Sequence, residues 1–484
     1  MDEVELKLEV APEAAEALET ADFLTGAPDR VEQRSVYFDT PGETLSKAGF
    51  SLRIRQANGA RVQTVKAVGA RAAGLFARSE WESAVADDTP CLDETTPVRA
   101  LVGEAADDIA PRFEVHVTRR IWTVRDEAAS IELVVDRGTV VAGDRRAALS
   151  EIELELKEGD PAALFALARR IDAVAPVRLG VLSKADRGYR LSGEAPSAVK
   201  AEPVLLHEDM TAAQAFQQIV QLCLRQFRLN EALLQQGRAA APLHQARVAL
   251  RRLRSAFSIF KPIIGDGDAA KFREELRWLS SELGDARNLD VLMEREVPAS
   301  LHDRIAAARD AAHDRVGEAL ASPRVRRLMI DLAEWTARGD WLAAEAGAAG
   351  RAQPATAFAV VALDRFRRKV KKDGRDLAGA DDETRHRVRK DTKKLRYASE
   401  FFEALFQRKR QRLRHKHFIR ALEDIQQQLG DLNDHATAPL LLKKIGIDKE
   451  PDAAALLMRH KRGKLIEAAV EAHDELVDAK RFWR

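Results

Sequence analysis

The sequence is poor in cysteine and in long apolar runs, and each scarcity excludes a class of protein. Only two of its 484 residues are cysteines, Cys91 and Cys223, and they form no CxxC pattern. This argues against a structural zinc site and is typical of a reducing compartment. No apolar run reaches the roughly 20 residues of a membrane-spanning helix. The acidic N-terminus, which includes Glu3 and Glu5, does not resemble a secretory signal. We therefore expect a cytoplasmic protein without a membrane span.

The chain also lacks a dominant charge, since its formal net charge is +1. The balance hides an asymmetry, because residues 1–200 carry 26 Lys and Arg against 35 Asp and Glu, and residues 201–484 carry 52 against 42. The length is too great for one ordinary core, so two or three domains are expected. The acidic and the basic part are expected to have different electrostatic roles.

Two stretches alternate acidic and apolar residues in the manner of β-strands. EVELKLEV, residues 3–10, sets Glu3, Glu5 and Lys7 on one face, and SEIELELKEGD, residues 150–160, does the same with three glutamates from Glu151 to Glu155. One interpretation is two solvated strand faces. The other is that both faces line one cavity, where so many carboxylates persist only if cations neutralise them, as in a divalent metal site. Spacing alone leaves both interpretations open.

The periodicity changes along the chain. Up to about residue 191 the pattern is mostly short alternating runs punctuated by Gly and Pro, which predicts a closed or strongly curved antiparallel sheet. From about residue 209 the apolar residues recur with helical spacing. The fold class predicted is α+β, a closed or strongly curved antiparallel sheet followed by an all-α duplicated helical bundle. The domains expected are 1–195, a linker at 196–205, and 206–484 with repeats at about 206–342 and 356–484.

An internal repeat supports the duplication. HQARVALRRLR starts at His244 and HRVRKDTKKLR at His386, and LGDARNLD and LGDLNDHA follow in the same order at nearly the same offset. Each copy places four basic residues on one helical arc, without acidic partners inside HQARVALRRLR. A charged arc is also how a solvated face looks, but uncompensated repulsion favours an anion-binding surface. The residues are His244, Arg247, Arg251 and Arg254, and His386, Arg389, Lys393 and Arg396.

Aromatic residues are scarce, at 6% with three tyrosines, and this bears on the ligand. Proteins that bind single-stranded nucleic acid interleave aromatic with basic residues so that bases can stack. Here Phe257, Phe260, Phe401 and Phe402 fall mainly on the apolar arcs, and only Tyr397 lies near a basic one. The arcs therefore favour polyphosphate, a linear polyanion without bases, over nucleic acid.

The residues resemble a known pair of domains. EVELK, YFDT at 37–40, LRIR at 52–55, Lys66, SEIELE at 150–155 and SKADRGY at 183–189 resemble, in this order, a CYTH domain, the triphosphate tunnel metalloenzyme fold. The region from about residue 206 to the end, with its paired basic motifs, resembles a CHAD domain. The second copy departs from the pattern, since LGDLND lacks the arginine found at 287. Together the two domains are similar to bacterial inorganic triphosphatases.

The resemblance implies an eight-stranded tunnel with a charged interior that hydrolyses inorganic triphosphate with Mg²⁺ or Mn²⁺, and CHAD helices that bind polyphosphate. Association with polyphosphate granules would follow. Glu5, Lys7 and Arg55 are the expected catalytic residues. The expected metal ligands are Glu3, Glu5, Glu151, Glu153 and Asp136, with Glu155 as a spare on the same face. The phosphate-binding residues expected in the tunnel are Lys7, Arg53, Arg55, Lys66, Arg78, Arg119 and Lys184.

Three alternatives stay open at this point. A tunnel of this kind can serve an adenylate cyclase or a thiamine triphosphatase, since all need metal carboxylates and a basic phosphate cradle. In a third reading, the protein mainly binds polyphosphate or targets granules, and its tunnel contributes little catalysis. The attached CHAD-like region favours inorganic polyphosphate chemistry, by association and not through the site itself.

Overall fold

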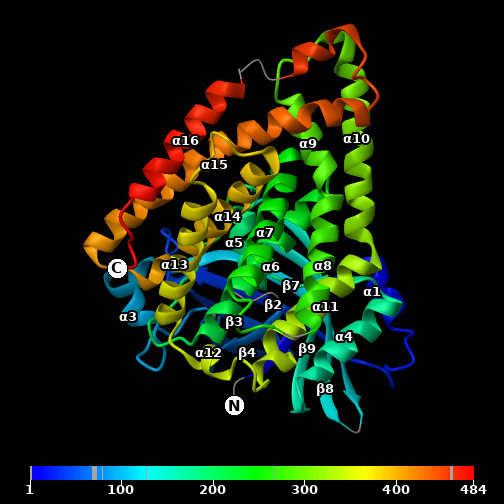
Figure 1. The fold of residues 1–484 in the computed structure, drawn as a ribbon. Coiled ribbons are helices and arrows are strands. Elements are labelled where there is room, and N and C mark those ends of the chain that lie inside the picture. The colour runs from blue at the N-terminus through cyan, green and yellow to red at the C-terminus, as the bar shows by residue number, and fades with distance from the viewer. Residues whose placement is uncertain (1–2, 68–73, 79, 127, 266, 458–461) are drawn as a thin grey trace. The chain divides into compact units, whose positions relative to one another are not determined.

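The computed structural model describes residues 3–67, 74–78, 80–126, 128–265, 267–457 and 462–484. The chain divides into two compact units. The first comprises residues 1–197 together with 321–337, and the second comprises 198–320 and 338–484 (Figure 1). A short helical segment from the middle of the chain thus belongs to the unit that the N-terminal part builds.

The first unit is built around one antiparallel sheet with the order β10-β1-β9-β8-β7-β2-β3-β4-β6, and β5 pairs with β1. The strands are β1 Glu3–Val10, β2 Asp29–Asp39, β3 Phe50–Ala57, β4 Ala60–Ala67, β5 Leu75–Arg78, β6 Glu80–Ala84, β7 Ala110–Arg125, β8 Ala129–Ala142, β9 Arg145–Gly159 and β10 Val177–Leu179. The long strands β7, β8 and β9 pair in the order of the chain and form two neighbouring antiparallel hairpins (Figure 1).

The two ends of this strand order are reached by consecutive stretches of the chain. Strand β6 pairs with β4 at one end of the order, and β5 pairs with β1 near the other. Strands β5 and β6 are separated by a single position, residue 79, so the segment 75–84 joins both ends of the sheet. A sheet closed in this way has an inner and an outer face, and side chains along each strand alternate between them.

Helices cover apolar parts of the outer face. The helices of the first unit are α1 Pro12–Leu18, α2 Thr44–Lys47, α3 Val98–Val102, α4 Ala162–Val174, α5 Lys184–Ser192 and α11 Pro323–Arg338. Helix α4 packs on β1, β8 and β9, and α2 and α3 share a core with β2, β3 and β4. Because Leu6, Leu8 and Leu154 are fully buried, the charged residues that alternate with them lie on the inner face.

Helix α11 is bound to the first unit by ion pairs. Arg169 of α4 pairs with Glu334 and, at 2.7 Å, with Asp331 of α11. Arg326 of α11 donates to Asp172 at 2.6 Å, and both side chains are largely buried. Partly buried ion pairs fix the relative position of two elements better than exposed pairs do. Here they join segments about 160 residues apart in the sequence.

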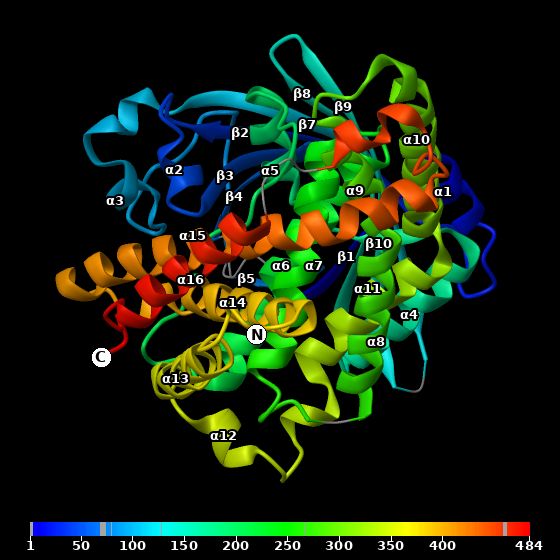
Figure 2. The same cartoon turned by 45° about the horizontal axis from the view of Figure 1, so that its top comes forward.

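The second unit is helical and duplicated. Its helices are α6 Ala212–Leu234, α7 Ala240–Ile259, α8 Gly267–Glu282, α9 Gly284–Met293, α10 Ala299–Ala321, α12 Ala348–Ala352, α13 Ala355–Asp373, α14 Asp382–Phe401, α15 Lys409–Lys444 and α16 Arg462–Asp478. The hairpins α6–α7 and α13–α14 pack on one another, and α15 and α16 run side by side in orange and red (Figure 2). Helices α7 and α14 carry the two basic motifs and are both 20 residues long.

These observations confirm the predicted fold class, an antiparallel sheet followed by a helical region. The predicted domain boundaries stay a prediction, since α11 lies in the helical part of the sequence yet groups with the first unit. As for the membrane, none of the helices in the described ranges is both long and apolar enough to cross one.

Candidate functional site in the tunnel and on the basic helices

Three carboxylates from two neighbouring strands meet inside the first unit. Asp136 of β8 lies opposite Glu151 of β9, and Glu153 follows two positions along β9. Asp136 and Glu151 are fully buried, and the three residues offer oxygens that all lie within 4.8 Å of one another. Three carboxylates this close repel strongly, so they require cations to stay ionised.

Three cations of the same chain surround these carboxylates. Lys7 of β1 donates to Glu153 Oε1 at 2.5 Å and lies 3.5 Å from Glu151 Oε1. Arg119 of β7 donates to both oxygens of Asp136, at 2.8 and 2.6 Å, and to Glu153 at 2.9 Å. With Lys184, described next, three positive charges balance three negative ones.

Lys184 comes from helix α5, whose start is fixed by local sequence. Ser183 caps the helix, its hydroxyl accepting from the Asp186 amide in a capping box. Gly188 lets α5 approach β7, since a Cβ there would lie 2.0 Å from the Phe113 ring. The Lys184 ammonium thereby reaches three oxygens, at 2.7 Å from Asp136 Oδ2, 2.5 Å from Glu151 Oε1 and 3.0 Å from Glu153 Oε1.

The pKa shifts favour the charged forms of Lys7, Glu153 and Asp136. Burial alone would lower the pKa of Lys7, but Glu151 and Glu153 outweigh it and raise that pKa. Burial would likewise raise the pKa of Glu153, yet Lys184, Lys7 and Arg119 hold it well below the ordinary value. The pKa of Asp136 is lowered against burial by Lys184 and Arg119. The cluster is a buried and internally compensated charge network.

Cations dominate the wall formed by β3 and β4. Arg53 and Arg55 project from β3 opposite Tyr37 and Ser35 of β2, and Lys66 of β4 lies opposite Ser51. The charge of Arg53, with burial and the charge of Arg119, lowers the pKa of Arg55 to about 10. Burial and Arg53 lower the pKa of Lys66, although it pairs with Glu80.

The arginines of this wall have unused hydrogen-bonding capacity. Within the described part of the chain, the Nε atoms of Arg53 and Arg55 are buried and have no hydrogen-bond partner. Among the described residues, Arg53 makes a long contact of 3.5 Å to the Tyr37 hydroxyl, and the Tyr37 ring stacks on Phe113 at 4.7 Å. Buried guanidinium donors without partners are costly, and an oxyanion entering the tunnel would satisfy them.

The charge of Glu5 acts on lysines of both walls. Its carboxylate raises the pKa of Lys7 on its own strand and opposes the lowering of the pKa of Lys66. In the register of the sheet it lies opposite Glu155 of β9, whereas Glu151 lies opposite Glu9. The side chains of Glu3 and Arg78, both expected in the tunnel, lie outside the described part of the structure.

A second group of cations lies on helices α7, α9 and α14, and we call it the basic helix cluster: His244, Arg247, Arg251, Arg287, Arg389 and Lys393. Neighbouring arginines and burial lower the pKa of His244 to about 4 and that of Arg247 to about 10. The pKa of Lys393 falls to about 7 through burial, Arg389, Arg251 and Arg247. Because Arg247 and Arg251 belong to the first repeat and Arg389 and Lys393 to the second, the fold joins both copies of the motif.

Three residues predicted on the basic arcs, Arg396, Arg254 and His386, lie outside the basic helix cluster as defined here. Arg396 pairs with Glu400 at 2.8 Å and Arg254 is exposed. His386 is exposed and its Nδ1 lies 3.2 Å from Asn433 Oδ1, although Arg389 and Lys393 both contribute to lowering its pKa. Within the described residues, the Nε atoms of Arg251 and Arg389 are buried without a hydrogen-bond partner. These two resemble the tunnel arginines in having capacity for an anion.

Comparisons with known proteins agree with this geometry. The CYTH domain model matches residues 1–189 and the CHAD domain model matches residues 218–443. The chain carries a CYTH domain followed by a CHAD domain. A crystal structure of the CHAD domain from the plant Ricinus communis is 29% identical and covers 60% of this chain and 98% of that chain, with a TM-score of 0.50.

Two further proteins resemble the chain over its CYTH part. The inorganic triphosphatase of Haemophilus influenzae is 29% identical over 203 residues, which are 40% of this chain and 56% of that protein. The match thus spans little more than half of the relative. The Hippeastrum protein HpAC1, described as having a dominant triphosphatase activity, is 20% identical and covers 39% of this chain and 96% of that chain, with a TM-score of 0.30.

The acidic side of the CYTH tunnel suits a divalent cation in the kind of donors it offers. Carboxylate oxygens are the ligands that Mg²⁺ and Mn²⁺ prefer. Glu151 Oε2 is buried without a hydrogen-bond partner among the described residues, and Arg187 Nε lies 3.6 Å from it. This acceptor is open to a hard cation, whereas the oxygens of Asp136 and Glu153 already lie against Lys7, Lys184 and Arg119.

The sequence alone named Glu155 only as a spare metal ligand and gave Arg287 no role in a site. Glu155 shares the face of Glu151 and Glu153, but only the register shows that it is the neighbour of Glu5 across the strands. Arg287 of α9 belongs to a motif visible in the sequence, and its charge helps lower the pKa of both His244 and Arg247 in the CHAD domain. In the first case no local signal could have settled the partner, since a strand's register is set by the whole sheet.

Proposed function

We propose that the CYTH tunnel hydrolyses inorganic triphosphate in a metal-dependent reaction and that the basic helix cluster of the CHAD domain binds polyphosphate. One observation carries the first part: the tunnel sets buried guanidinium donors of Arg53 and Arg55, which have no partner among the described residues, against a cluster of three carboxylates. A triphosphate bridges such walls, since its oxygens accept from arginine and its charge attracts a cation. The likeness to an inorganic triphosphatase supports the same substrate.

The basic wall binds and orients the substrate in this proposal. Arg53, Arg55 and Lys66 donate to the non-bridging oxygens, and the planar guanidinium forks fix the phosphorus positions better than a lysine could. Lys7 holds Glu153 in place through its 2.5 Å hydrogen bond. Water then attacks the terminal phosphorus in line, the phosphoanhydride bond breaks, and orthophosphate and pyrophosphate leave.

The metal ligands proposed are Glu3, Glu5, Glu151, Glu153 and Asp136. Glu155 is added as a candidate because it lies opposite Glu5 in the register. A bound Mg²⁺ or Mn²⁺ supplies charge neutralisation and a water of lowered pKa. Lys7, Lys184 and Arg119 lower the pKa of Glu153, and Lys184 and Arg119 that of Asp136, which keeps these two carboxylates able to act as ligands.

The test is phosphate release from tripolyphosphate, ATP and thiamine triphosphate with Mg²⁺ or Mn²⁺. Glu5→Gln keeps the shape of the side chain and removes one charge, so we expect turnover to be almost lost with the fold retained. Glu158→Gln, the same change at an exposed position of β9, is the matched control and should stay active. Wild-type activity in Glu5→Gln would refute the assignment of this carboxylate.

The same assay separates the alternatives. Cyclic AMP formed from ATP would indicate an adenylate cyclase, and a preference for thiamine triphosphate would indicate that substrate. No product from any of them would leave a polyphosphate-binding protein as the best account. Binding is tested with Arg247, Arg251, Arg389 and Lys393 all changed to Gln, and intact binding of long chains in that variant would refute the role of the basic helix cluster. Affinity in the wild type should fall steeply with salt.

A further inference from the structure

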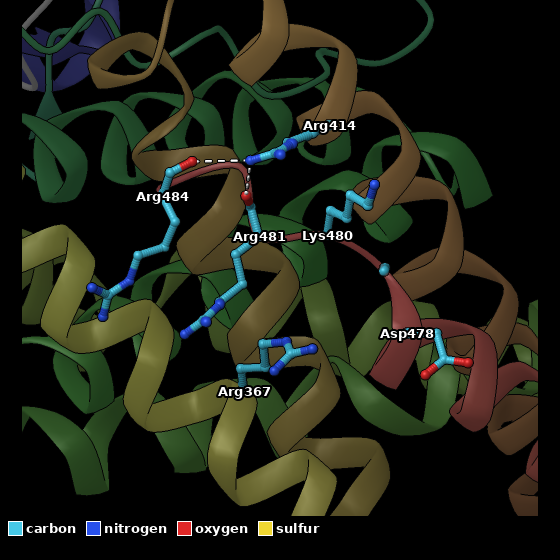
Figure 3. A pocket seen from close by; sticks show the side chains of 7 residues that line it. Arg367, Arg414, Asp478, Lys480, Arg481 and Arg484 are labelled. Atoms are coloured by element: carbon cyan, nitrogen blue, oxygen red, sulfur yellow. Dashed lines mark hydrogen bonds between the residues drawn. The ribbon is translucent and has the colours of Figure 1, made fainter.

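A second basic site lies in the helical unit, at the C-terminal end of the described chain. A pocket of about 320 Å³ is lined by side chains of α13, of α15 and of the segment that follows α16 (Figure 3). We call it the C-terminal basic pocket, and its lining residues are Arg367, Arg414, Asp478, Ala479, Lys480, Arg481 and Arg484. Five of these seven are cationic and one is anionic. At roughly 30 Å³ per water, the volume would hold about ten waters, which is room for more than one phosphate group.

The segment after α16 is anchored by aromatic residues. Phe482 is fully buried and packs edge-on against Phe406, at 5.5 Å between ring centroids. Trp483 is 3% exposed, packs on Phe418 at 5.2 Å and donates from Nε1 to Asp364 Oδ1 at 2.9 Å. These contacts place the cationic neighbours of Phe482 and Trp483 at the pocket.

The pocket has more cations than the surrounding carboxylates neutralise. Asp364 pairs with Arg484 and lies 3.3 Å from Arg481, and Asp478 is the one acidic residue in the lining. Counting side chains alone, five cations against these two carboxylates leave three cationic side chains in excess. Burial and the charge of Arg481 lower the pKa of Arg367, as expected where like charges are held together.

Two arginines of the pocket are held in place by backbone carbonyls. Arg414 Nη1 donates to the carbonyls of Arg484 at 3.0 Å and Arg481 at 3.3 Å, which Figure 3 shows as dashed lines. Arg367 Nη2 donates to the Val477 carbonyl at 2.5 Å, while its buried Nε has no hydrogen-bond partner among the described residues. Fixed guanidinium groups lose little entropy on binding an anion.

We propose that the C-terminal basic pocket binds phosphate groups, as free inorganic phosphate or as part of a polyphosphate chain, at a site separate from the basic helix cluster. The phosphate oxygens would accept from Arg367, Lys480 and Arg481. A nucleic acid is disfavoured because no aromatic ring lines the pocket on which a base could stack. The proposal does not depend on hydrolysis in the tunnel, so either can fail without the other.

The test is local to the pocket and uses the full chain. Lys480 is exposed and is acetylated with an amine-reactive ester, and its modification rate is read by mass spectrometry with added inorganic phosphate, tripolyphosphate or long-chain polyphosphate. At about ten times the dissociation constant, bound ligand should slow acetylation of Lys480 roughly tenfold. Lys464, exposed near the start of α16 and about 20 Å along that helix from its last residue, is the internal control and should react at an unchanged rate.

Variants show whether the pocket itself is responsible. Arg481→Gln and Arg367→Gln, each checked for folding by circular dichroism, should abolish the protection of Lys480. Arg251→Gln with Lys393→Gln should leave it intact. Protection by phosphate alone would identify free phosphate as the ligand, and protection only by the longer anions would identify a chain. Equal protection by chloride at matched ionic strength, no protection, or loss of protection in the Arg251 and Lys393 variant would overturn the proposal.

Discussion

Lys184 donates to carboxylates from two strands, and two of these, Asp136 and Glu151, have no exposed surface. The free energy of burying those charges is offset only while the cations stay in place, because the interior cannot solvate an isolated carboxylate. The same holds for Lys7 and Arg119, so charge balance inside the tunnel depends on a few long side chains. On the basic wall the charges are not balanced in this way. Among the described residues, Arg53 and Arg55 have buried Nε donors without a hydrogen-bond partner.

Replacing Lys184 by Met should therefore destabilise the CYTH domain strongly. Removing one partner of a buried ion pair costs of order 3–5 kcal/mol, because the remaining charge is uncompensated. Lys157→Met is the control, since Lys157 pairs with Glu155 at 2.5 Å but is half-exposed, and a loss below about 1 kcal/mol is expected there. Urea unfolding of the intact chain, followed by a signal from the sheet, measures both. Equal losses in the two variants would contradict this account.

The lowered pKa values of Glu153 and Asp136 predict loss of stability in acid. A carboxyl whose pKa is lower in the folded than in the unfolded state stabilises the fold above its ordinary pKa, and this contribution disappears as the pH falls through the folded value. The melting temperature of the CYTH domain should thus fall progressively below about pH 5. In Lys184→Met the dependence should be weaker, since those pKa values return toward normal. An unchanged pH profile in the variant would argue against the network.

At the scale of elements, the duplication brings together two basic helices, one from each repeat. A single repeat contains only one of them. Helices α7 and α14 are in contact, so cations that are 142 residues apart in sequence repel one another. In a solvated helix face such groups would keep ordinary pKa values, whereas here Lys393 has a pKa of about 7. The cluster is therefore destabilised without an anion, which is the condition in which a polyanion binds favourably.

This pKa predicts that polyphosphate affinity falls as the pH rises through about 7, because Lys393 then loses its charge. One charge-assisted hydrogen bond contributes about 1.5–3 kcal/mol, so the loss should be roughly tenfold or more. Lys393→Arg stays charged and should remove that part of the dependence. Calorimetric titrations with long-chain polyphosphate between pH 6 and 9 measure the affinity of the protein with Lys393 and of the Lys393→Arg variant. Both carry Glu5→Gln, which prevents turnover. A pH dependence that survives in Lys393→Arg would assign it to another group.

At the scale of the whole molecule, the order of the sequence and the grouping in space differ. Helix α11 lies between two segments of the CHAD unit in sequence, but it belongs to the unit of the CYTH sheet, where Arg169 and Asp172 of α4 bind it. The two units are therefore connected by more than one passage of the chain.

We predict that a fragment of residues 1–197 is less stable than the same fragment joined through a flexible linker to residues 321–338. The first lacks the ion pairs of Arg169 and Asp172 with α11 and exposes the surface that α11 covers. The difference should reach a few kcal/mol, as for loss of partly buried pairs. Thermal unfolding of both fragments measures it. A third fragment with Arg326→Met in the joined helix should lie between them, and identical melting temperatures for all would disprove the role of α11.

The sequence by itself determined the fold class, the duplication of the helical region, and which residues share one face of a strand or helix. Alternation with period two placed the charges of β1 and β9 opposite their apolar neighbours, and the repeated basic motifs defined α7 and α14, because such periods follow from local backbone geometry. Tertiary structure decided which of these groups meet. That Glu5 lies opposite Glu155, that Lys184 reaches Asp136, and that α11 joins the first unit all depend on register and long-range packing. No local period encodes these, since they are set by the closure of the whole sheet and the burial of distant surfaces.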